Sequence, residues 1–183
     1  MKRITFLLIA VTVAGIVTEM VPASGQAGQT NGGATPIFLT EMPRGYRDLS
    51  LISVSRLTAG NGSSQLRAEL GNDTAIRAYR ESTLPFPDGT IIAALHWSEA
   101  SSEENKAVLA QGFPGAGIQS FIPGSALNMQ FMVKDSKKYS VTGGWGFGDF
   151  TNGKPASEAQ MKTCYACHLP AKDHDFVFTR YAP

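Results

Sequence analysis

The sequence predicts an α+β protein, mainly an antiparallel β-sheet with a few short helices. Two observations lead to this prediction. Apolar, β-branched runs recur along the chain and end at residues that favour turns, which is typical of strands joined by hairpins. Helix-capping signals occur at two places, one of them near the C-terminus. No internal repeat is present, so we expect a single folded domain.

The first predicted strands form a hairpin. Residues 50–58 are apolar and β-branched and end at the turn-forming stretch AGNGSS. Residues 65–70 alternate apolar and polar side chains, as a half-buried strand does, and can pair with the first run. Asn72 or Asp73 then caps a helix over residues 74–82. Further strands are expected at 90–98, 118–122, 127–133 and 175–181, and a strand or loop at 143–150.

A second helix is predicted after Pro155. Ser157 and Gln160 stand three residues apart, the spacing of a capping box at a helix N-terminus. We expect this helix to stop at Leu169–Pro170, because proline disrupts a helix interior. It therefore carries the segment Cys164–His168, which holds both cysteines of the chain.

The N-terminus has the features of a secretory signal. Lys2 and Arg3 precede an apolar run over residues 4–17, and small residues follow it. The apolar run is short for a membrane span. We expect a signal peptide over residues 1–25, a flexible tether over 26–40 and one domain over 41–183.

The charge balance of the expected mature chain excludes one class of partner. The full sequence has 16 Lys+Arg and 15 Asp+Glu, and removal of residues 1–23 takes away Lys2, Arg3 and Glu19, which leaves equal numbers. A neutral chain gives no reason to expect nucleic-acid binding. From the charge balance we expect no nucleic-acid partner. From the signal sequence we expect an exported, periplasmic protein with no membrane association after signal cleavage.

The motif Cys-x-x-Cys-His indicates covalent attachment of haem c. On a helix, Cys164, Cys167 and His168 share one face, because residues three and four apart are neighbours. Two thiols can then form thioethers along one porphyrin edge, and the imidazole can bind the iron. Cys164 and Cys167 are thus the predicted cofactor-binding residues and His168 the predicted iron ligand. We expect the second ring nitrogen of His168 to donate to a carbonyl or carboxylate.

The motif has three other interpretations. Zinc could use both cysteines with His168 and His174, but neighbouring residues rarely bind one tetrahedral ion, and zinc-finger spacing is longer. A redox dithiol would be expected near a βαβ pattern. A structural disulfide between Cys164 and Cys167 can form outside the cytosol. The spacing favours haem over these, and His174 is interpreted as a solvated loop residue.

The ligand on the other side of the iron decides between electron transfer and small-molecule chemistry. Candidates for this position are His96, Met129 and Met132. Each also has an ordinary interpretation as a core side chain. Aromatic residues that could form an apolar wall around a porphyrin, or equally part of the core, are Phe86, Phe121, Phe131, Trp145 and Phe147.

The order of several segments resembles the cytochrome P-460 family. These segments are YRDLSLISV, FPDGT, VKDSKKY, GGWGF, the haem motif and DFVFTRY, which together extend from Tyr46 to Tyr181. The resemblance implies an exported, dimeric, β-rich protein with haem c. Some members oxidise hydroxylamine or nitric oxide at a five-coordinate haem. Others, the β-type cytochromes c prime, bind nitric oxide in an apolar pocket lined by phenylalanine.

The resemblance also singles out two positions. In the hydroxylamine-oxidising members, a lysine four residues after the threonine of Asp-Gly-Thr is joined to the porphyrin, and this chain has Ala94 there. A distal glutamate lies three residues before the valine of Val-Lys-Asp, and this chain has Gln130. Alanine cannot form the link, and glutamine cannot transfer a proton as a carboxylate does. Strand alternation places His96 on the side of Ala94, so Gln130 and His96 are the predicted distal groups.

These observations give one functional hypothesis and one alternative. The hypothesis is a periplasmic mono-haem c-type cytochrome with an open distal site, which binds or oxidises a small nitrogen ligand of the nitric oxide or hydroxylamine class without the lysine–haem link. The alternative is a six-coordinate electron carrier with His96 or a methionine as sixth ligand. Whether the protein is an enzyme stays open. The expected partners are a small-molecule ligand, an unidentified redox partner and, by resemblance, a second copy of the chain.

Overall fold

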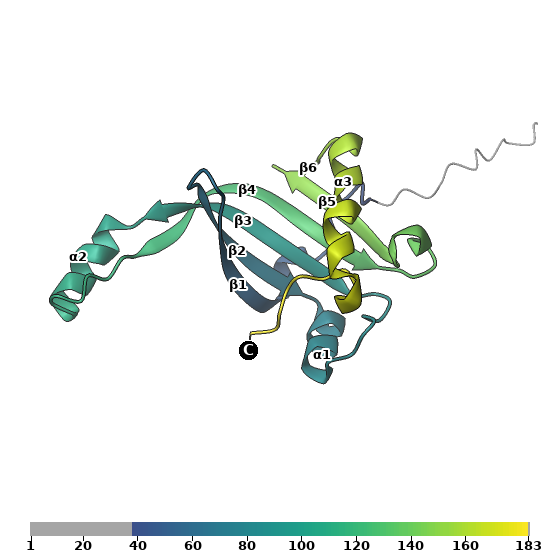
Figure 1. The fold of residues 1–183 in the computed structure, drawn as a ribbon, viewed down its shortest axis with the longest axis horizontal. Coiled ribbons are helices and arrows are strands. Elements are labelled where there is room, and N and C mark those ends of the chain that lie inside the picture. The colour runs from purple at the N-terminus through teal and green to yellow at the C-terminus, as the bar shows by residue number, and fades with distance from the viewer. Residues whose placement is uncertain (1–37, 183) are drawn as a thin grey trace, which may run out of the picture. The chain divides into compact units, whose positions relative to one another are not determined.

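The described residues form an antiparallel sheet with helices on one face (Figure 1). The structure is a computed structural model that describes residues 38–182. Within them, six strands follow the order β1-β2-β3-β4-β5-β6, so each strand pairs with its neighbour in sequence. The predicted α+β class, with a helix near the C-terminus, is confirmed. The predicted signal peptide and residues 26–37 of the predicted tether lie outside the described residues.

The first hairpin has the predicted strands and pairing. β1 and β2 are antiparallel, with Ser50 opposite Gly71 and Thr58 opposite Ser64. A bulge at the start of β1, between Leu51 and Ser53, shifts the register by one residue. The strands are β1 (Ser50–Thr58), β2 (Ser64–Gly71), β3 (Ile91–Ser101), β4 (Phe121–Lys134), β5 (Trp145–Thr151) and β6 (Lys154–Pro155).

Two strand predictions were wrong. Residues 118–122 and 127–133 were expected as separate strands, but β4 is one strand of 14 residues. β3 pairs with it from Ser101–Phe121 to Ile91–Val133, and bulges absorb the irregular middle. Residues 175–181 were expected as a strand, but Asp175 and Phe176 have φ values of 52° and 65°, which turn the chain away from extended geometry. The predicted strand or loop at 143–150 is largely β5, which runs from Trp145 to Thr151.

The helices follow their capping signals. In α1 (Asp73–Glu81), the side chain of Asn72 accepts from the backbone N–H of Ala75, as predicted. In α3 (Glu158–His168), the side chain of Ser157 accepts from the N–H of Gln160. α3 ends at His168 with Leu169 as its C-cap, so the predicted stop at Leu169–Pro170 is confirmed. A separate 3₁₀ helix follows over Leu169–His174, because proline is tolerated in the first turn of a new helix. The sequence analysis did not identify α2 (Glu103–Gly112).

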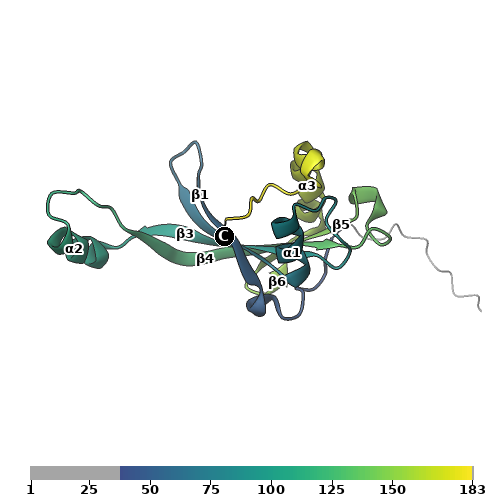
Figure 2. The same cartoon turned by 90° about the horizontal axis from the view of Figure 1, so that it is seen from below.

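Different groups of residues cover the two faces of the sheet. α1, α3 and the C-terminal segment lie on one face, and the turn Tyr46–Asp48 lies on the other (Figures 1 and 2). The core on the α3 side includes Ile52, Ile76, Ile92, Met132, Trp145, Phe147 and Val177. A second cluster on the opposite face includes Ala93, Phe131 and Phe150, with Leu39, Met42 and Tyr46 packed against it. Both faces of the central strands are therefore buried.

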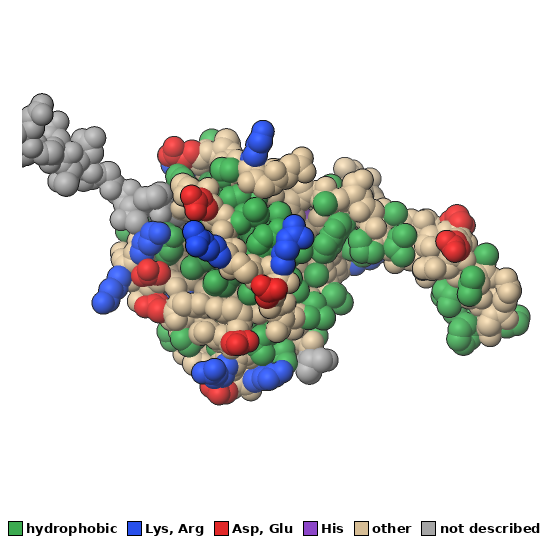
Figure 3. Space-filling model, turned by 180° about the vertical axis from the view of Figure 1, so that it is seen from behind, with side chains coloured by type: hydrophobic (Ala, Val, Ile, Leu, Met, Phe, Trp, Pro, Cys, Tyr) green, Lys and Arg blue, Asp and Glu red, His purple; other side chains and the backbone are tan. Residues whose placement is uncertain are grey.

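The ends of β3 and β4 extend beyond the other strands and carry α2 between them (Figure 1). We call residues 99–123 the β3–β4 arm. Figure 3 shows apolar side chains along this arm. Val108 and Phe113 are 63% and 58% exposed, and Phe121 is 46% exposed. Across residues 38–182, no helix is both long enough and apolar enough to span a membrane.

Candidate functional site

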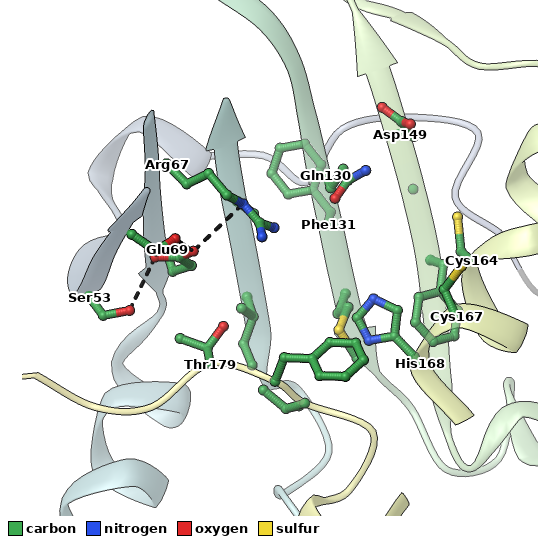
Figure 4. A pocket seen from close by; sticks show the side chains of 18 of the residues that line it. Ser53, Arg67, Glu69, Gln130, Phe131, Asp149, Cys164, Cys167, His168 and Thr179 are labelled. Carbon is green, nitrogen blue, oxygen red and sulfur yellow. Dashed lines mark hydrogen bonds and ion pairs between the residues drawn. The ribbon is translucent and has the colours of Figure 1, made fainter. Parts of the chain in front are cut away.

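α3 and the sheet enclose a cavity of about 730 Å³. Cys164, Cys167 and His168 line it from the helix, so the structure brings together the three residues of the motif (Figure 4). Met161, one turn earlier, is 1% exposed and anchors the helix in the core. Burial and, secondarily, the negative charge of Asp149 raise the pKa of the Cys164 thiol. The volume lies within the range of about 300–1,000 Å³ typical of ligand and cofactor sites.

The ring of His168 is held in one orientation. Its Nδ1 donates to the backbone carbonyl of Phe176 at 2.7 Å, which confirms the predicted hydrogen bond and leaves Nε2 as the nitrogen available to a metal. The ring also packs between Phe147 and Phe178, with 5.1 Å between ring centroids on each side. Burial lowers the pKa of His168, although the bond to Phe176 opposes this effect. The imidazole is therefore presented in its neutral, ligating form.

The opposite wall of the cavity is a row of side chains across five strands. Ser53 pairs with Glu69, Glu69 with Ala94, Ala94 with Gln130, and Gln130 with Asp149. All five residues line the cavity. We call the strand residues that line the cavity the sheet wall. The two residues that the family resemblance singled out, Ala94 and Gln130, are thus direct cross-strand neighbours with a carboxylate on each side.

The carboxylate of Glu69 is buried, at 5% exposure, and hydrogen-bonded. The hydroxyls of Ser53 and Ser55 donate to its two oxygens at 3.1 and 2.8 Å. Arg67 forms a longer ion pair with it, 3.7 Å from Nε to Oε1. The Nε of Arg67 is buried without a hydrogen-bond partner within the described residues, and the guanidinium points into the space facing His168 (Figure 4). This wall therefore offers a cation to a bound group.

Asp149 connects the sheet to the helix. Its carboxylate, 4% exposed, accepts from the amide of Asn128 at 2.7 Å and from the amide of Gln160 at 3.0 Å. Gln160 lies in α3, one turn before Cys164. Asp149 thus holds the cysteine-bearing helix against β5, and both of its oxygens are occupied by protein donors.

The structure places His96 in the next row of the same sheet face. His96 is paired with Arg67 across the strands, and its Nδ1 lies 3.3 Å from the side-chain oxygen of Gln65. Its Nε2 is buried without a partner within the described residues. Burial, and then the charge of Arg67, lower the pKa of His96 to about 4, against the attraction of Asp149. His96 is not among the residues that line the cavity.

Only some of the other candidates reach the cavity. Met132 and Phe147 line it. Met129 packs in the cluster on the opposite face, so it is wrong as a candidate iron ligand. Phe131 reaches the lining, but its ring packs edge-on against Tyr46 and Phe150 in that same cluster. The remaining aromatic candidates do not wall the cavity: Phe86 and Trp145 are core residues, and Phe121 lies on the β3–β4 arm.

The structure gives no support to the zinc or disulfide interpretations. Within residues 38–182, no three His, Cys, Asp or Glu side chains are grouped so that they could hold a metal ion. Cys164 and Cys167 are both free thiols. His174 is exposed at the end of the 3₁₀ helix and does not line the cavity, in agreement with its interpretation as a solvated residue.

Sequence analysis missed the charged half of the cavity. Arg67 and Glu69 were treated only as the polar side of a half-buried strand, yet it is this side that faces α3. The strand alternation already placed both residues on one face. The missing information was that helix α3 covers that face, which depends on tertiary packing. The segment 177–180, which was predicted as part of a strand, also lines the cavity.

These residues fit a haem. The donor set is two thiols and one neutral imidazole on a single helix face, with apolar contacts from Ile92, Met132, Phe147, Val177 and Phe178 around them. The guanidinium of Arg67, whose Nε makes no hydrogen bond within the described residues, adds a cation on the facing wall. A cavity with this lining would suit a flat, largely apolar cofactor.

Comparison with known proteins identifies the family. Residues 43–179 match the family model Cytochrome P460, which covers more than half of the chain. The chain therefore belongs to the cytochrome P460 family, and the predicted family is confirmed. Membership implies haem binding. A search of curated proteins finds no match.

Proposed function

We propose that this protein is an exported mono-haem c-type cytochrome that binds a small nitrogen ligand of the nitric oxide class. The observation that carries the proposal is the facing arrangement of Cys164, Cys167 and His168 with Ala94 and Gln130 across one cavity. Membership of the cytochrome P460 family supports it. The iron of a bound haem would supply the coordination site and the redox chemistry, while the protein supplies attachment, orientation and the polarity of the cavity.

The α3 wall, formed by Cys164, Cys167 and His168, would account for the attachment of haem. The two thiols stand on the helix face that meets the cavity, where thioether bonds would fix one porphyrin edge. His168 Nε2 would bind the iron, because Nδ1 is already committed to Phe176. The sheet wall would lie on the other side of the macrocycle and meet a ligand there.

Ala94 and Gln130 favour ligand binding over the hydroxylamine-oxidising activity known in this family. Ala94 has no group that could link to a porphyrin. None of the hydrogen bonds described for residues 38–182 uses the side chain of Gln130, so its amide is available to a ligand. An amide can donate to a bound ligand but does not take up a proton at neutral pH. Oxidation of a hydroxylamine-class substrate would have to use another base, and Glu69 is the buried carboxylate beside Ala94.

A spectroscopic experiment tests the proposal. The mature protein is expressed with the c-type maturation machinery, examined on a haem-stained denaturing gel and titrated with nitric oxide. A stained band and a high-spin spectrum that changes on addition of nitric oxide are expected. Cys164→Ser with Cys167→Ser should remove the stain. A low-spin spectrum that does not respond to nitric oxide would overturn the open site.

The alternative is an electron carrier in which a sixth protein ligand fills the distal position. Met132 is the methionine that lines the cavity, and His96 has a free Nε2 one row away. In such a carrier, Met132→Leu or His96→Ala should convert a low-spin spectrum to high-spin. With an open site, both variants should keep the high-spin spectrum of the parent protein.

We further propose that the protein forms a homodimer in the periplasm. The family resemblance supports this, and the exposed apolar side chains of the β3–β4 arm provide a surface on which to test it. Analytical ultracentrifugation should give twice the mass of one chain. A monomer at micromolar concentration would contradict the proposal.

A further inference from the structure

The proximal histidine depends on a backbone carbonyl in an unusual turn. Phe176, whose carbonyl accepts the Nδ1–H bond of His168, has φ 65°, and Asp175 before it has φ 52°. Non-glycine residues rarely occupy this left-handed region, and each such residue costs about 1–3 kcal/mol unless its surroundings hold it there. The orientation of the carbonyl therefore requires contacts that fix the turn.

A buried ion pair supplies these contacts. Lys134 Nζ lies 2.7 and 2.8 Å from the two oxygens of Asp175, and the two side chains are 5% and 8% exposed. The ammonium also donates to the carbonyl of Gly143 at 2.9 Å, and the backbone N–H of Phe86 donates to Asp175 at 2.8 Å. Both charges are thus fully hydrogen-bonded, which a buried pair needs in order to be stable.

The ion pair ties the turn to the sheet at a fixed place. Lys134 is the last residue of β4 and also lies over the ring of Trp145, 4.9 Å from its centroid. The ring of Phe176 packs where a side chain at Gly143 would otherwise be, since a Cβ there would lie 2.1 Å from it. The turn is therefore held from β4, from the 86–87 loop and from the glycine at 143.

We propose that Lys134 and Asp175 form a positioning pair for the haem-binding histidine. The pair fixes the turn at 175–176, the turn aims the Phe176 carbonyl at His168 Nδ1, and this bond orients the ring and makes Nε2 a stronger donor to iron. This inference rests on the proposed haem attachment. It assigns a role to the segments VKD and DFVF, which contain Lys134 and Asp175.

The test uses a double variant that removes both charges. Lys134→Met with Asp175→Asn keeps a similar size at each position, and asparagine still accepts a left-handed conformation. Neutral replacement of a whole buried pair is tolerated far better than loss of one partner, so the holoprotein should fold. The matched control is Lys162→Met with Glu158→Gln, which removes a 2.7 Å pair on the exposed face of the same haem-bearing helix.

Two measurements on the holoprotein distinguish positioning from a general structural role. Resonance Raman spectra of the ferrous protein should show a lower or broader iron–histidine stretching band in the double variant. The midpoint potential should rise, with a ferric-to-ferrous ratio changed by up to about tenfold, or about 59 mV for one electron. The control should match the parent protein in both measurements.

Failure of the positioning role and failure of the proposed function would give different results. An unchanged stretching band and potential in a folded double variant would overturn the positioning role while leaving haem attachment intact. Lys134→Arg, which keeps the charge, should move both values less than the double variant does. Absence of covalent haem in the parent protein would instead overturn the proposed function on which this inference rests.

Discussion

The two walls of the cavity are built in different ways. The α3 wall comes from a short stretch of sequence, whose capping box, helical spacing and terminal turn place both thiols and the imidazole together. The sheet wall gathers one residue from each of five strands, and only the register brings them into a row. Local sequence therefore places the residues of the α3 wall, whereas tertiary pairing brings together the residues that face them.

The walls also differ in how their charges are compensated. Behind the α3 wall, Lys134 and Asp175 neutralise each other at short distance. In the sheet wall, Glu69 relies mainly on two serine hydroxyls, and the Nε of Arg67, 3.7 Å from Glu69, makes no hydrogen bond within residues 38–182. The Lys134–Asp175 pair therefore needs no ligand to compensate its charges, whereas the guanidinium of Arg67 can still donate a hydrogen bond to a ligand.

The largest effect is expected from breaking the charge pair behind the α3 wall. Asp175→Asn leaves the Lys134 ammonium buried without its counter-ion, which should lower the free energy of unfolding by about 3–5 kcal/mol. Glu158→Gln removes an exposed partner of Lys162 and should cost about 0–1 kcal/mol. Denaturant unfolding of both variants checks this. Equal losses would show that the buried pair has no special role.

The same difference between local sequence and tertiary packing decides which features could be predicted from the sequence. The hairpin of β1 and β2, both capped helices and the position of Cys164, Cys167 and His168 on one helix were predicted correctly, because each depends on neighbours in the chain. Glu69, Arg67 and Asp149 were not identified as cavity residues, because their burial depends on α3 packing over the sheet. The final segment was predicted as a strand, since its sequence gives no sign of the left-handed turn at Asp175 and Phe176, which tertiary contacts hold.

Beside the sheet wall, His96, the cross-strand partner of Arg67, should make stability depend on pH. Its pKa is lowered to about 4 from an ordinary value of 6.5, so between these values the unfolded chain binds a proton that the folded chain does not. The free energy of unfolding should therefore fall as the pH drops from 6.5 to 4, by on the order of 3 kcal/mol.

Substitution isolates this effect. His96→Gln should flatten the pH dependence across that window, measured by urea unfolding at several pH values. The control His174→Gln changes an exposed histidine and should leave the slope as it is in the parent protein. A parent protein whose stability is constant from pH 6.5 to 4 would show that His96 is not held neutral.

A smaller effect is expected from the support of Glu69. Ser55→Ala removes the 2.8 Å hydrogen bond to a carboxylate that is 5% exposed, and should cost about 1–2 kcal/mol of unfolding free energy. Ser101→Ala removes a 2.7 Å bond to the exposed Glu103 and should have little effect. Thermal unfolding of the two variants compares them. If Ser55→Ala loses no more unfolding free energy than the control, water replaces the hydrogen bond that the Ser55 hydroxyl donates to Glu69.

The smallest effect concerns the ligand itself. If the amide of Gln130 donates to a bound ligand, Gln130→Leu should remove about 1 kcal/mol of binding free energy, or about fivefold in affinity. Stopped-flow measurement of nitric oxide dissociation checks this, because loss of one contact acts mainly on the off-rate. Met129→Leu is the matched control, since Met129 is the adjacent residue of β4 and packs on the opposite face. Equal off-rates in the two variants would show that the amide of Gln130 makes no contact with the ligand.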